Sequence, residues 1–363
     1  MDTAQAERAK YWVGFHHVPF IGPVRIRRLV EHFGDLENAW VAQPNELRSV
    51  LDERAIQSLE KVRRELALDR EMEKIEKLGI AVLTIEDDGY PRLLREIPAP
   101  PPVLFVKGTL TENDRIAVSI VGTRRATSYG REMARRIASE LAEAGVTIVS
   151  GLARGIDAIA HQAALEAGGR TIAVLGSGVN VIYPSEHRQL AERVVEQGAL
   201  VADYPPDRKP DAVNFPARNR IISGMTLGTL VVEAPAKSGA LITTDFAADQ
   251  GREVFVVPGN VLSAASEGTN RLLRDGARAV MSAADILDDL DLERRREHIA
   301  VQTAFPVSEA ERRILSLLTA EPQHIDEIIV AANLSVSEGA ALLTQMELQG
   351  FVRNLGAQHY ARV

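Results

Sequence analysis

The chain has 363 residues, of which 45% are hydrophobic, and its formal net charge is −8. This length predicts two or three domains with buried cores, and the absence of cysteine excludes disulfides and thiolate metal sites. Because no run reaches about 18 apolar residues and the polar N-terminus lacks a signal-peptide core, we expect a cytoplasmic protein without a membrane span.

The acidic excess is shared by the beginning, the middle and the end of the chain, so no large segment is basic as a whole. A protein of this charge does not bind polyanions through its overall field. Any nucleic-acid site must therefore be a local cluster of arginines.

Residues 1 to about 80 have helical periodicity, with Leu29, Phe33 and Trp40 among the recurring apolar positions. The segment resembles a helix-hairpin-helix or SAM-like module, in which residues 21–24 form the hairpin and arginines 25, 27 and 28 follow. Such hairpins offer backbone amides to DNA, but Pro23 lacks an amide donor and the usual second glycine is absent. A packing role and a DNA contact both remain open.

Residues 81–284 alternate short apolar runs with helical stretches, which predicts a Rossmann-like α/β core with a mostly parallel sheet covered on both faces. Its ligands are expected at the carboxyl ends of the strands, near a topological switch point. We expect residues 103–106 to add an edge strand. The other predicted strands are 81–85, 116–121, 146–149, 171–175, 199–202, 228–232 and 253–257.

The first turn of this core departs from a dinucleotide-binding fingerprint. Of the glycines in G-x-G-x-x-G only Gly122 is in place, and Thr123, Arg124 and Arg125 occupy the turn. A backbone cradle for pyrophosphate is thus unexpected, whereas a guanidinium pairs bidentately with phosphate oxygens. We predict a phosphate contact here; the alternative is a surface arginine pair at a strand end.

The second strand ends in the sequence SGLARGID, which runs from Ser150 to residue 157. Gly151 permits a tight turn with close backbone approach, and Arg154 lies at its tip. Asp157 and His161 follow at i and i+4 on one helix face, a spacing that suits a metal pair or an acid–base pair. We favour a structural His–Asp hydrogen bond, because no third ligand lies nearby in sequence.

The third strand is followed by a glycine-containing loop with Gly178, and then by Tyr183 and Pro184. The glycine lets the backbone approach a ligand. Tyr183 either stacks on a nucleic-acid base or packs the loop onto the domain.

Basic groups and a helix start also occur together between residues 215 and 259. Glu233 in this stretch either orients an arginine or accepts hydrogen bonds from loop amides. No catalytic triad, nucleophile elbow, Walker lysine or two-carboxylate metal site is recognisable, so no catalytic residue, metal or cofactor is predicted. The candidate phosphate-binding residues in the stretch are Arg218, Asn219, Arg220, Lys237, Ser238 and Gly239.

Residues 285–305 are highly charged and predict a linker, and residues 306–363 predict a winged helix. Ser308 and Ser335 should cap its first and third helices, residues 325–331 form the second, and a two-stranded wing follows. The third helix, 336–348, contains no lysine or arginine. Since a DNA-reading helix needs basic or amide side chains, we expect this module to contact protein or to regulate.

Together these motifs strongly resemble the DNA processing protein A family, also called DprA or Smf. The resemblance implies a Rossmann-like core that binds single-stranded DNA and forms a homodimer. It also implies help in loading RecA recombinase during natural transformation and competence, by a protein that is not regarded as an enzyme. The matching stretches run in order over about 160 residues: VGTRRATSYG, SGLARGIDAIAH, TIAVLGSGVNVIYP, FPARNRII, VVEAPAKSGALITT and GREVFVVPG.

The resemblance also assigns residues. Arg124 should hold a phosphate, and Gly122, Ser150, Gly151 and Gly178 should line the groove. The motif also contains arginines 218 and 220 with the asparagine between them, and which of them touches DNA stays open. The chain has Ala-Asp at 202–203 where many members have Ser-Glu, and Ser-Gly-Met-Thr at 223–226 in place of Ala-Gly-Leu-Ser.

Two enzymatic alternatives are weaker. The stretch from Gly228 to Glu233 is similar to nucleotide phosphoribohydrolases of the lysine-decarboxylase-like family, but it lacks their Pro-Gly-Gly, and Glu233 is one residue too far from Thr229. A nuclease would have to use Asp157 and His161, for which no second carboxylate is evident near the ligand edge.

Overall fold

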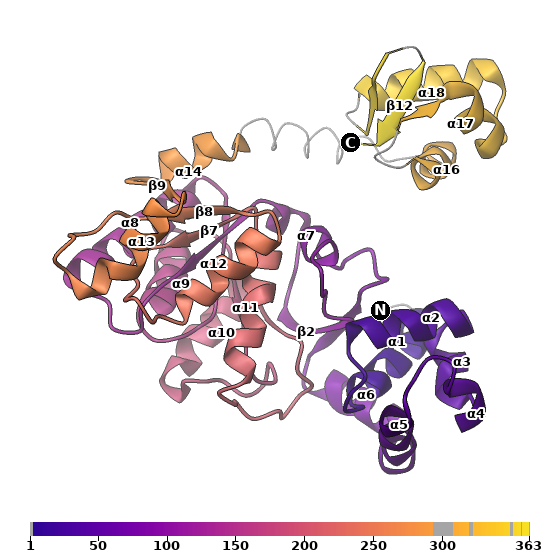
Figure 1. Cartoon of the computed structure of the whole chain (residues 1–363), viewed down its shortest axis with the longest axis horizontal. Helices are drawn as coiled ribbons and strands as arrows, with labels where there is room; N and C mark the ends of the chain where they lie inside the picture. The colour runs from indigo at the N-terminus through magenta and orange to yellow at the C-terminus, as the bar shows by residue number, and fades with distance from the viewer. Residues whose placement is uncertain (1–2, 293–307, 319–321, 349–350, 357, 363) are drawn as a thin grey trace. The chain divides into compact units, whose positions relative to one another are not determined.

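The computed structural model describes residues 3–292, 308–318, 322–348, 351–356 and 358–362. It divides into two compact units, Met1–Ile286 and Leu287–Val363 (Figure 1). The predicted helical segment and the predicted sheet therefore belong to one unit.

The helical segment packs directly onto the sheet. One hydrophobic core contains Phe15, Leu29 and Leu59 from the helices together with Phe105 and Leu200 from strands. Burying both sets in one core removes a large apolar area from water, which explains why the segment is not a separate body. Its helices are α1 (Thr3–His16), α2 (Pro23–Phe33), α3 (Leu36–Val41), α4 (Pro44–Leu47), α5 (Glu53–Glu65) and α6 (Leu68–Lys77).

The predicted hairpin at residues 21–24 leads into α2. Pro23 is the first residue of that helix, where its missing amide costs nothing. Arg25 forms an ion pair with Asp52, whose carboxylate also caps α5 by accepting from the amide of Ala55. These contacts pack the hairpin against α5.

The described strands of the first unit form one nine-stranded sheet in the order β1-β2-β6-β5-β4-β3-β7-β8-β9. The segment from β6 to β9 is parallel, whereas β2 is antiparallel to both β1 and β6. The expectation that residues 103–106 form an edge strand was wrong, because β1 covers β2. The strands are β1 (Ala81–Thr84), β2 (Val103–Gly108), β3 (Ala117–Val121), β4 (Thr147–Ser150), β5 (Thr171–Val174), β6 (Ala199–Ala202), β7 (Gly228–Val231), β8 (Glu253–Val256) and β9 (Arg278–Ala279).

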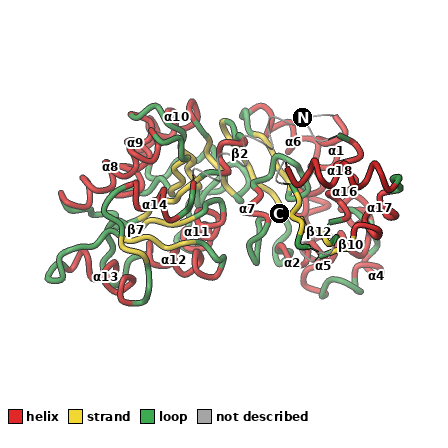
Figure 2. Tube along the Cα trace, turned by 90° about the horizontal axis from the view of Figure 1, so that it is seen from above, coloured by secondary structure: helices red, strands yellow, loops and turns green. Residues whose placement is uncertain are grey.

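Helices cover both faces of the parallel sheet, as predicted. Figure 2 shows α8, α9 and α10 on one side of the strands and α11, α12 and α13 on the other. The chain winds outward from β3 to β6 and then returns to place β7 beside β3, so the switch point lies at β3 and β7. These helices are α8 (Ser128–Glu143), α9 (Ile156–Glu166), α10 (Arg188–Gln197), α11 (Asn214–Gly224), α12 (Ala240–Asp249) and α13 (Glu267–Arg274).

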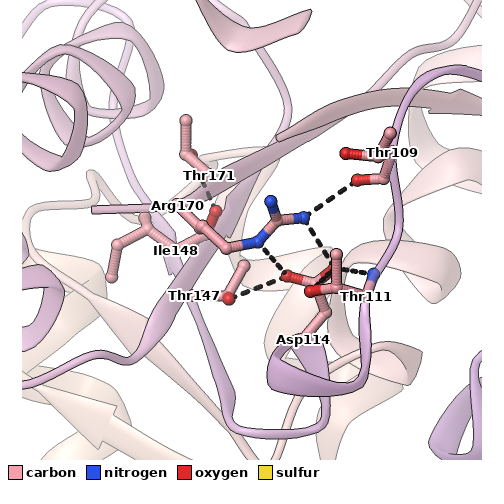
Figure 3. A network of polar contacts seen from close by, with 7 residues as sticks. All are labelled: Thr109, Thr111, Asp114, Thr147, Ile148, Arg170 and Thr171. Carbon is pink, nitrogen blue, oxygen red and sulfur yellow. Dashed lines mark hydrogen bonds and ion pairs between the residues drawn. The ribbon is translucent and has the colours of Figure 1, made fainter. Parts of the chain in front are cut away.

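A polar network fastens the amino-terminal edge of the sheet (Figure 3). Asp114, in the short helix η1 (Glu112–Arg115), accepts from Nε and Nη2 of Arg170 at 3.0 and 2.9 Å and from Oγ1 of Thr147 at 2.9 Å. Arg170 Nη2 also donates to the carbonyl of Thr109. Because Thr147 begins β4 and Arg170 precedes β5, the network joins the starts of neighbouring strands.

The end of the first unit and the predicted linker overlap. Helix α14 (Ala283–Asp289) occupies the first part of the segment 285–305 that we predicted as a linker. Helical backbone is stabilised at this point by Asp285, which accepts from the amides of Met281 and Ser282. Residues 293–305 lie outside the described part of the chain.

The second unit is a winged helix. Ser308 caps α16 in a capping box with Glu311, and Ser335 accepts from the amide of Glu338 at the start of α18. The described helices pack on a three-stranded sheet of order β10-β12-β11, to which β10 adds a strand that was not predicted. The elements are α16 (Glu309–Leu317), β10 (Gln323–His324), α17 (Ile325–Ala332), α18 (Val336–Leu348), β11 (Val352–Asn354) and β12 (His359–Arg362).

None of the described helices has, by itself, the length and apolar composition of a membrane span. The pair Ile325–Ala332 and Val336–Glu347, bent by 110°, passes on those two criteria only when taken together.

Candidate functional site

A cavity of about 760 Å³ opens at the carboxyl-terminal edge of the sheet, at the switch point. Its lining comes mainly from the turn after β3, the first half of α11 with the loop before it, and the turn that leads into α12. The segments after β4 and β5 add Ala153, Asp157 and Tyr183. The predicted site residues that line it are Gly122, Thr123, Arg124, Arg125, Tyr183, Arg218, Asn219, Lys237, Ser238 and Gly239.

The other predicted site residues do not line this cavity. Gly151 and Arg154 line a small pocket beside the cavity, together with Tyr183 and Pro184. Ser150, Gly178 and Arg220 line neither space. Buried Ser150 donates its hydroxyl to the carbonyl of Ile120 at 2.6 Å, and the amide of Gly178 donates to the carbonyl of Arg208 at 2.9 Å.

Three cations stand at the cavity with their side chains exposed: Arg124, Arg125 and Lys237. Within the described residues none of them has a carboxylate in ion-pair distance. A cation without an acidic partner has no ion pair to give up when an anion arrives. These three groups therefore provide the positive charge that the cavity offers to a ligand.

Two aromatic rings extend this charged surface. The Tyr183 and Phe215 rings lie 5.5 Å apart between centroids, and the guanidinium of Arg124 lies 5.9 Å from the Phe215 ring. Tyr183 is 43% exposed. Packing of the loop onto the domain, one of its two predicted roles, therefore covers the ring only in part. Sequence reasoning missed Phe215, although the residue stands immediately before the arginine motif.

Arg218 is buried, and its contacts favour the bracing role over the DNA contact, the two roles left open for the motif arginines. It is 5% exposed, and its Nη1 donates to the carbonyl of Gly151 at 2.9 Å and also to the carbonyl of Val174. Burial lowers the pKa of Arg218 to about 10, so it remains charged near neutral pH. A side chain at Gly151 would collide with this guanidinium, which explains the glycine.

Arg220 and Arg154 are engaged in ion pairs. Arg220 Nη2 lies 2.6 Å from Asp203 Oδ2 at a site where both side chains are largely buried. Arg154 makes a bidentate pair with Glu186 at 2.6 and 2.7 Å on the exposed surface. Neither arginine of the motif holds Glu233, so the predicted buttress was wrong.

Glu233 instead accepts hydrogen bonds from a loop amide, the second of the two predicted roles. It is 2% exposed, and its carboxylate accepts from the amide and the hydroxyl of Thr127 at 2.8 and 2.7 Å. Thr127 caps α8 and accepts from the amide of Gly130 at 3.1 Å. The chain's own carboxylate therefore fills the helix N-terminus at which a dinucleotide fold holds pyrophosphate.

The favoured hydrogen bond between Asp157 and His161 is absent. Asp157 accepts from the amides of Gly151 and Ala153 at 3.1 and 3.4 Å, and burial raises its pKa. His161 Nδ1 lies 2.6 Å from Oγ1 of Thr171, and burial lowers the pKa of His161 to about 3. Both side chains therefore serve the fold, and the described residues contain no cluster of three or more possible metal ligands.

Comparison with known proteins agrees with this architecture. Residues 81–291 match the family model described as DNA recombination-mediator protein A, and residues 299–358 match the DprA winged helix domain. Protein Smf of Synechocystis sp. is 36% identical over 99% of this chain and 100% of its own length.

Two solved structures are also similar. DNA processing protein A from Streptococcus pneumoniae is 33% identical, with a TM-score of 0.69 over 77% of this chain and 97% of that one. The protein from Helicobacter pylori, whose structure concerns its single-stranded DNA binding mode, is 28% identical, with a TM-score of 0.53 over 59% of this chain and 96% of that one. The sheet order, the cavity at its switch point and these matches lead to one conclusion: the chain belongs to the DNA recombination-mediator protein A family, DprA or Smf.

Proposed function

We propose that this protein binds single-stranded DNA in the cavity at the carboxyl edge of the sheet. The observation that carries the proposal is the combination of three exposed cations, without acidic partners in the described part of the chain, and two neighbouring aromatic rings around one opening. Cations that follow the backbone and rings that stack on bases are the two components of sequence-tolerant single-strand recognition. The structure of the Helicobacter pylori relative, which concerns single-stranded DNA binding, supports the proposal.

The residues divide into contacts and supports. Arg124, Arg125 and Lys237 hold phosphates, and the backbone amide of Gly239 lies beside them at the start of α12. A base stacks on Tyr183. Gly122, Thr123 and Asn219 shape the lining, while Ser150, Gly151, Gly178, Arg218 and Arg220 hold the loops in place.

The test is a salt titration of oligothymidylate binding to the full-length protein. Arg124→Ala should weaken binding about tenfold and lower the magnitude of the slope of log affinity against log salt by about 0.7. The variant makes one phosphate contact fewer than wild type, so fewer counterions are released when DNA binds. Arg135→Ala is the matched control, since Arg135 lies on α8 outside the cavity lining and pairs with Glu132. A folded Arg124→Ala protein with wild-type affinity would refute the assignment.

We propose a binding role without catalysis. Glu233 would have to act in a phosphoribohydrolase, but both of its oxygens accept bonds from Thr127 and it is buried. Asp157 and His161 would have to act in a nuclease, but each is bound to other partners. Release of a free base from AMP, or cleavage of labelled single strands with Mg²⁺ that is lost in Asp157→Ala, would revive these alternatives.

We further propose that the protein acts as a cytoplasmic homodimer that loads RecA recombinase onto incoming strands in natural transformation. The recombination-mediator description of the family supports the loading role. Exposed Val261 and Leu262, which follow β8, suit a subunit contact. Leu262→Arg should give monomers in light scattering, and wild-type protein should shorten the lag of RecA ATP hydrolysis on single strands coated with single-strand-binding protein. A Leu262→Arg variant that is still dimeric would contradict the proposed subunit contact. An unchanged lag would contradict the proposed loading of RecA.

For the winged helix we propose a protein contact. Helix α18 carries no basic residue, and residues 307–363 contain four basic against seven acidic side chains. Phosphate contacts dominate DNA affinity, so such a surface is a poor duplex binder. Retardation of duplex DNA by this module at physiological salt would contradict the proposal.

A further inference from the structure

The N-terminal helices contact the loop that forms one wall of the cavity. This loop, residues 203–213, connects β6 to α11, and its Pro210 and Ala212 line the cavity. The loop consists of turns and irregular backbone. Its position therefore depends on side-chain contacts, and two of these come from α1 and α6.

The first contact joins α1 to α11 through the loop. His16, the last residue of α1, has its Nε2 2.5 Å from the carbonyl oxygen of Asp203. A carbonyl oxygen only accepts, so His16 donates from Nε2, and this bond selects the tautomer. The carboxylate of Asp203 in turn accepts from Nη2 of Arg220 at 2.6 Å. A continuous series of hydrogen bonds thus runs from α1 to the helix that carries Arg218 and Asn219.

The surroundings of this series are packed. Asp203 is 8% exposed, and the His16 ring lies 5.9 Å from that of Phe105, which is fully buried on β2. Burial lowers the pKa of His16, so the ring is neutral near pH 7. Hydrogen bonds in such a low-dielectric environment hold their geometry better than bonds on the surface.

The second contact is on the surface and offers a contrast. Lys74 of α6 lies 2.7 Å from Oδ2 of Asp207, whose Oδ1 accepts from Asn180 Nδ2 at 2.7 Å. Both side chains of the ion pair are about half exposed, and exposed pairs contribute little. The buried His16 contact is therefore the one that can fix the position of the wall.

We propose that His16 is a positioning residue for the cavity. The N-terminal helical segment sets the position of α11 through Asp203 and Arg220, and in this way it tunes the affinity for single-stranded DNA without touching the strand. The proposal rests on the proposed function, because the cavity must be the DNA site.

The experiment compares full-length wild type with His16→Phe, which keeps a ring against Phe105 and removes the donor. Oligothymidylate affinity should fall at least about threefold, the effect expected for a residue that acts through a shared network. The salt slope should stay at the wild-type value, because Arg124, Arg125 and Lys237 are intact. Amide hydrogen exchange should become faster in residues 203–213. His16→Gln, which retains a side-chain donor, should restore affinity in part.

The matched control is His32→Phe, because His32 is exposed on α2 and contacts Ser49 rather than the loop. A folded His16→Phe protein with wild-type affinity and wild-type exchange would overturn the proposal. Should His16→Phe fail to fold, Asp203→Ala replaces it. That variant keeps the carbonyl that His16 contacts and removes the carboxylate that Arg220 contacts, and wild-type affinity in it would equally overturn the proposal.

Failure of the proposed function gives a different result. In that case wild type itself does not bind oligothymidylate, or Arg124→Ala binds as well as wild type. The exchange measurement still decides the inference, because it reports the link between α1 and the loop without DNA. Unchanged exchange in His16→Phe would then refute that link.

Discussion

The two edges of the parallel sheet treat charge in opposite ways. At the amino-terminal edge, Asp114 and Arg170 neutralise each other, and the pair forms further hydrogen bonds with threonines and a carbonyl (Figure 3). At the carboxyl-terminal edge, Arg124 and Lys237 stand exposed beside a cavity without an acidic partner among the described residues. The first edge is closed and stabilises the fold, whereas the second is left open for an anion.

The carboxyl edge also contains a closed layer beneath its open one. Arg218 and Glu233 are buried there, and each forms its hydrogen bonds with the backbone or side chains of neighbouring loops. Burial and ion pairing thus separate the supporting cations at this edge from the cations that we propose as ligand contacts. Four measurements test this division.

The largest expected effect is that of Arg218→Leu. Removing the guanidinium leaves the buried carbonyls of Gly151 and Val174 and the carboxylate of Asp157 without their cation, which should cost about 3 kcal/mol or more of unfolding free energy. Urea unfolding measures this cost, and Arg218→Lys should recover part of it. Undiminished stability together with lost DNA affinity would place Arg218 among the ligand contacts instead.

Asp114→Ala should break the closed edge. The variant leaves Arg170 and Thr147 without their shared acceptor, and about 2 kcal/mol of unfolding free energy should be lost. Asp114→Asn, which keeps an acceptor, should lose less. Oligothymidylate affinity and its salt slope should not change in either variant; a changed slope would show that the two edges are coupled.

Acid should weaken the fold through buried histidines. The pKa of His161 is about 3 in the folded protein and near 6.5 when unfolded, so between these values the unfolded chain binds the extra proton. Stability is therefore complete above pH 6.5 and falls as the pH decreases, by about 2 kcal/mol between pH 7 and 5 for this group. When the unfolding free energy is measured as a function of pH across this range, its slope should be shallower in His161→Gln than in wild type. The control is His32→Gln, because His32 is exposed. Parallel curves would contradict the assignment.

The smallest effect is expected for Glu186→Gln. Arg154 is paired with Glu186 on the surface beside the cavity, and removing the acid should free its guanidinium for a phosphate. Oligothymidylate affinity should rise about two- to threefold at low salt with a slightly steeper salt slope, since one more cation is available. Glu132→Gln on α8 is the control. Weaker binding would mean that the ion pair itself shapes the site.

Much of the fold was predictable because its signals are local. Buried parallel strands appear as short apolar runs, so the predicted 146–149 and 199–202 lie within a residue of β4 and β6. Helix caps are equally local, and Ser308 and Ser335 begin their helices as expected. The prediction that β2 is an edge strand was wrong, because strand pairing there depends on β1, which is not adjacent to β2 in sequence.

The candidate site was predictable as a collection of motifs, since residues after parallel strands meet at one sheet edge. The division of labour among its arginines was not predictable. Arg218 reaches carbonyls 67 and 44 residues away, Arg220 pairs with a carboxylate 17 residues away, and Arg154 pairs with one 32 residues away. Arg124 has no such partner among the described residues, and this difference is the reason why we propose it as a ligand contact.

The sequence by itself thus determined most of the elements, their order and the sheet edge at which we expect a ligand, because apolar periodicity and glycine-containing turns act over a few residues. The tertiary structure alone decided which charged groups are buried or paired within the protein and which remain available to a ligand. Burial and ion pairing depend on groups that meet only after folding, as His16 and Asp203 do across 187 residues of chain.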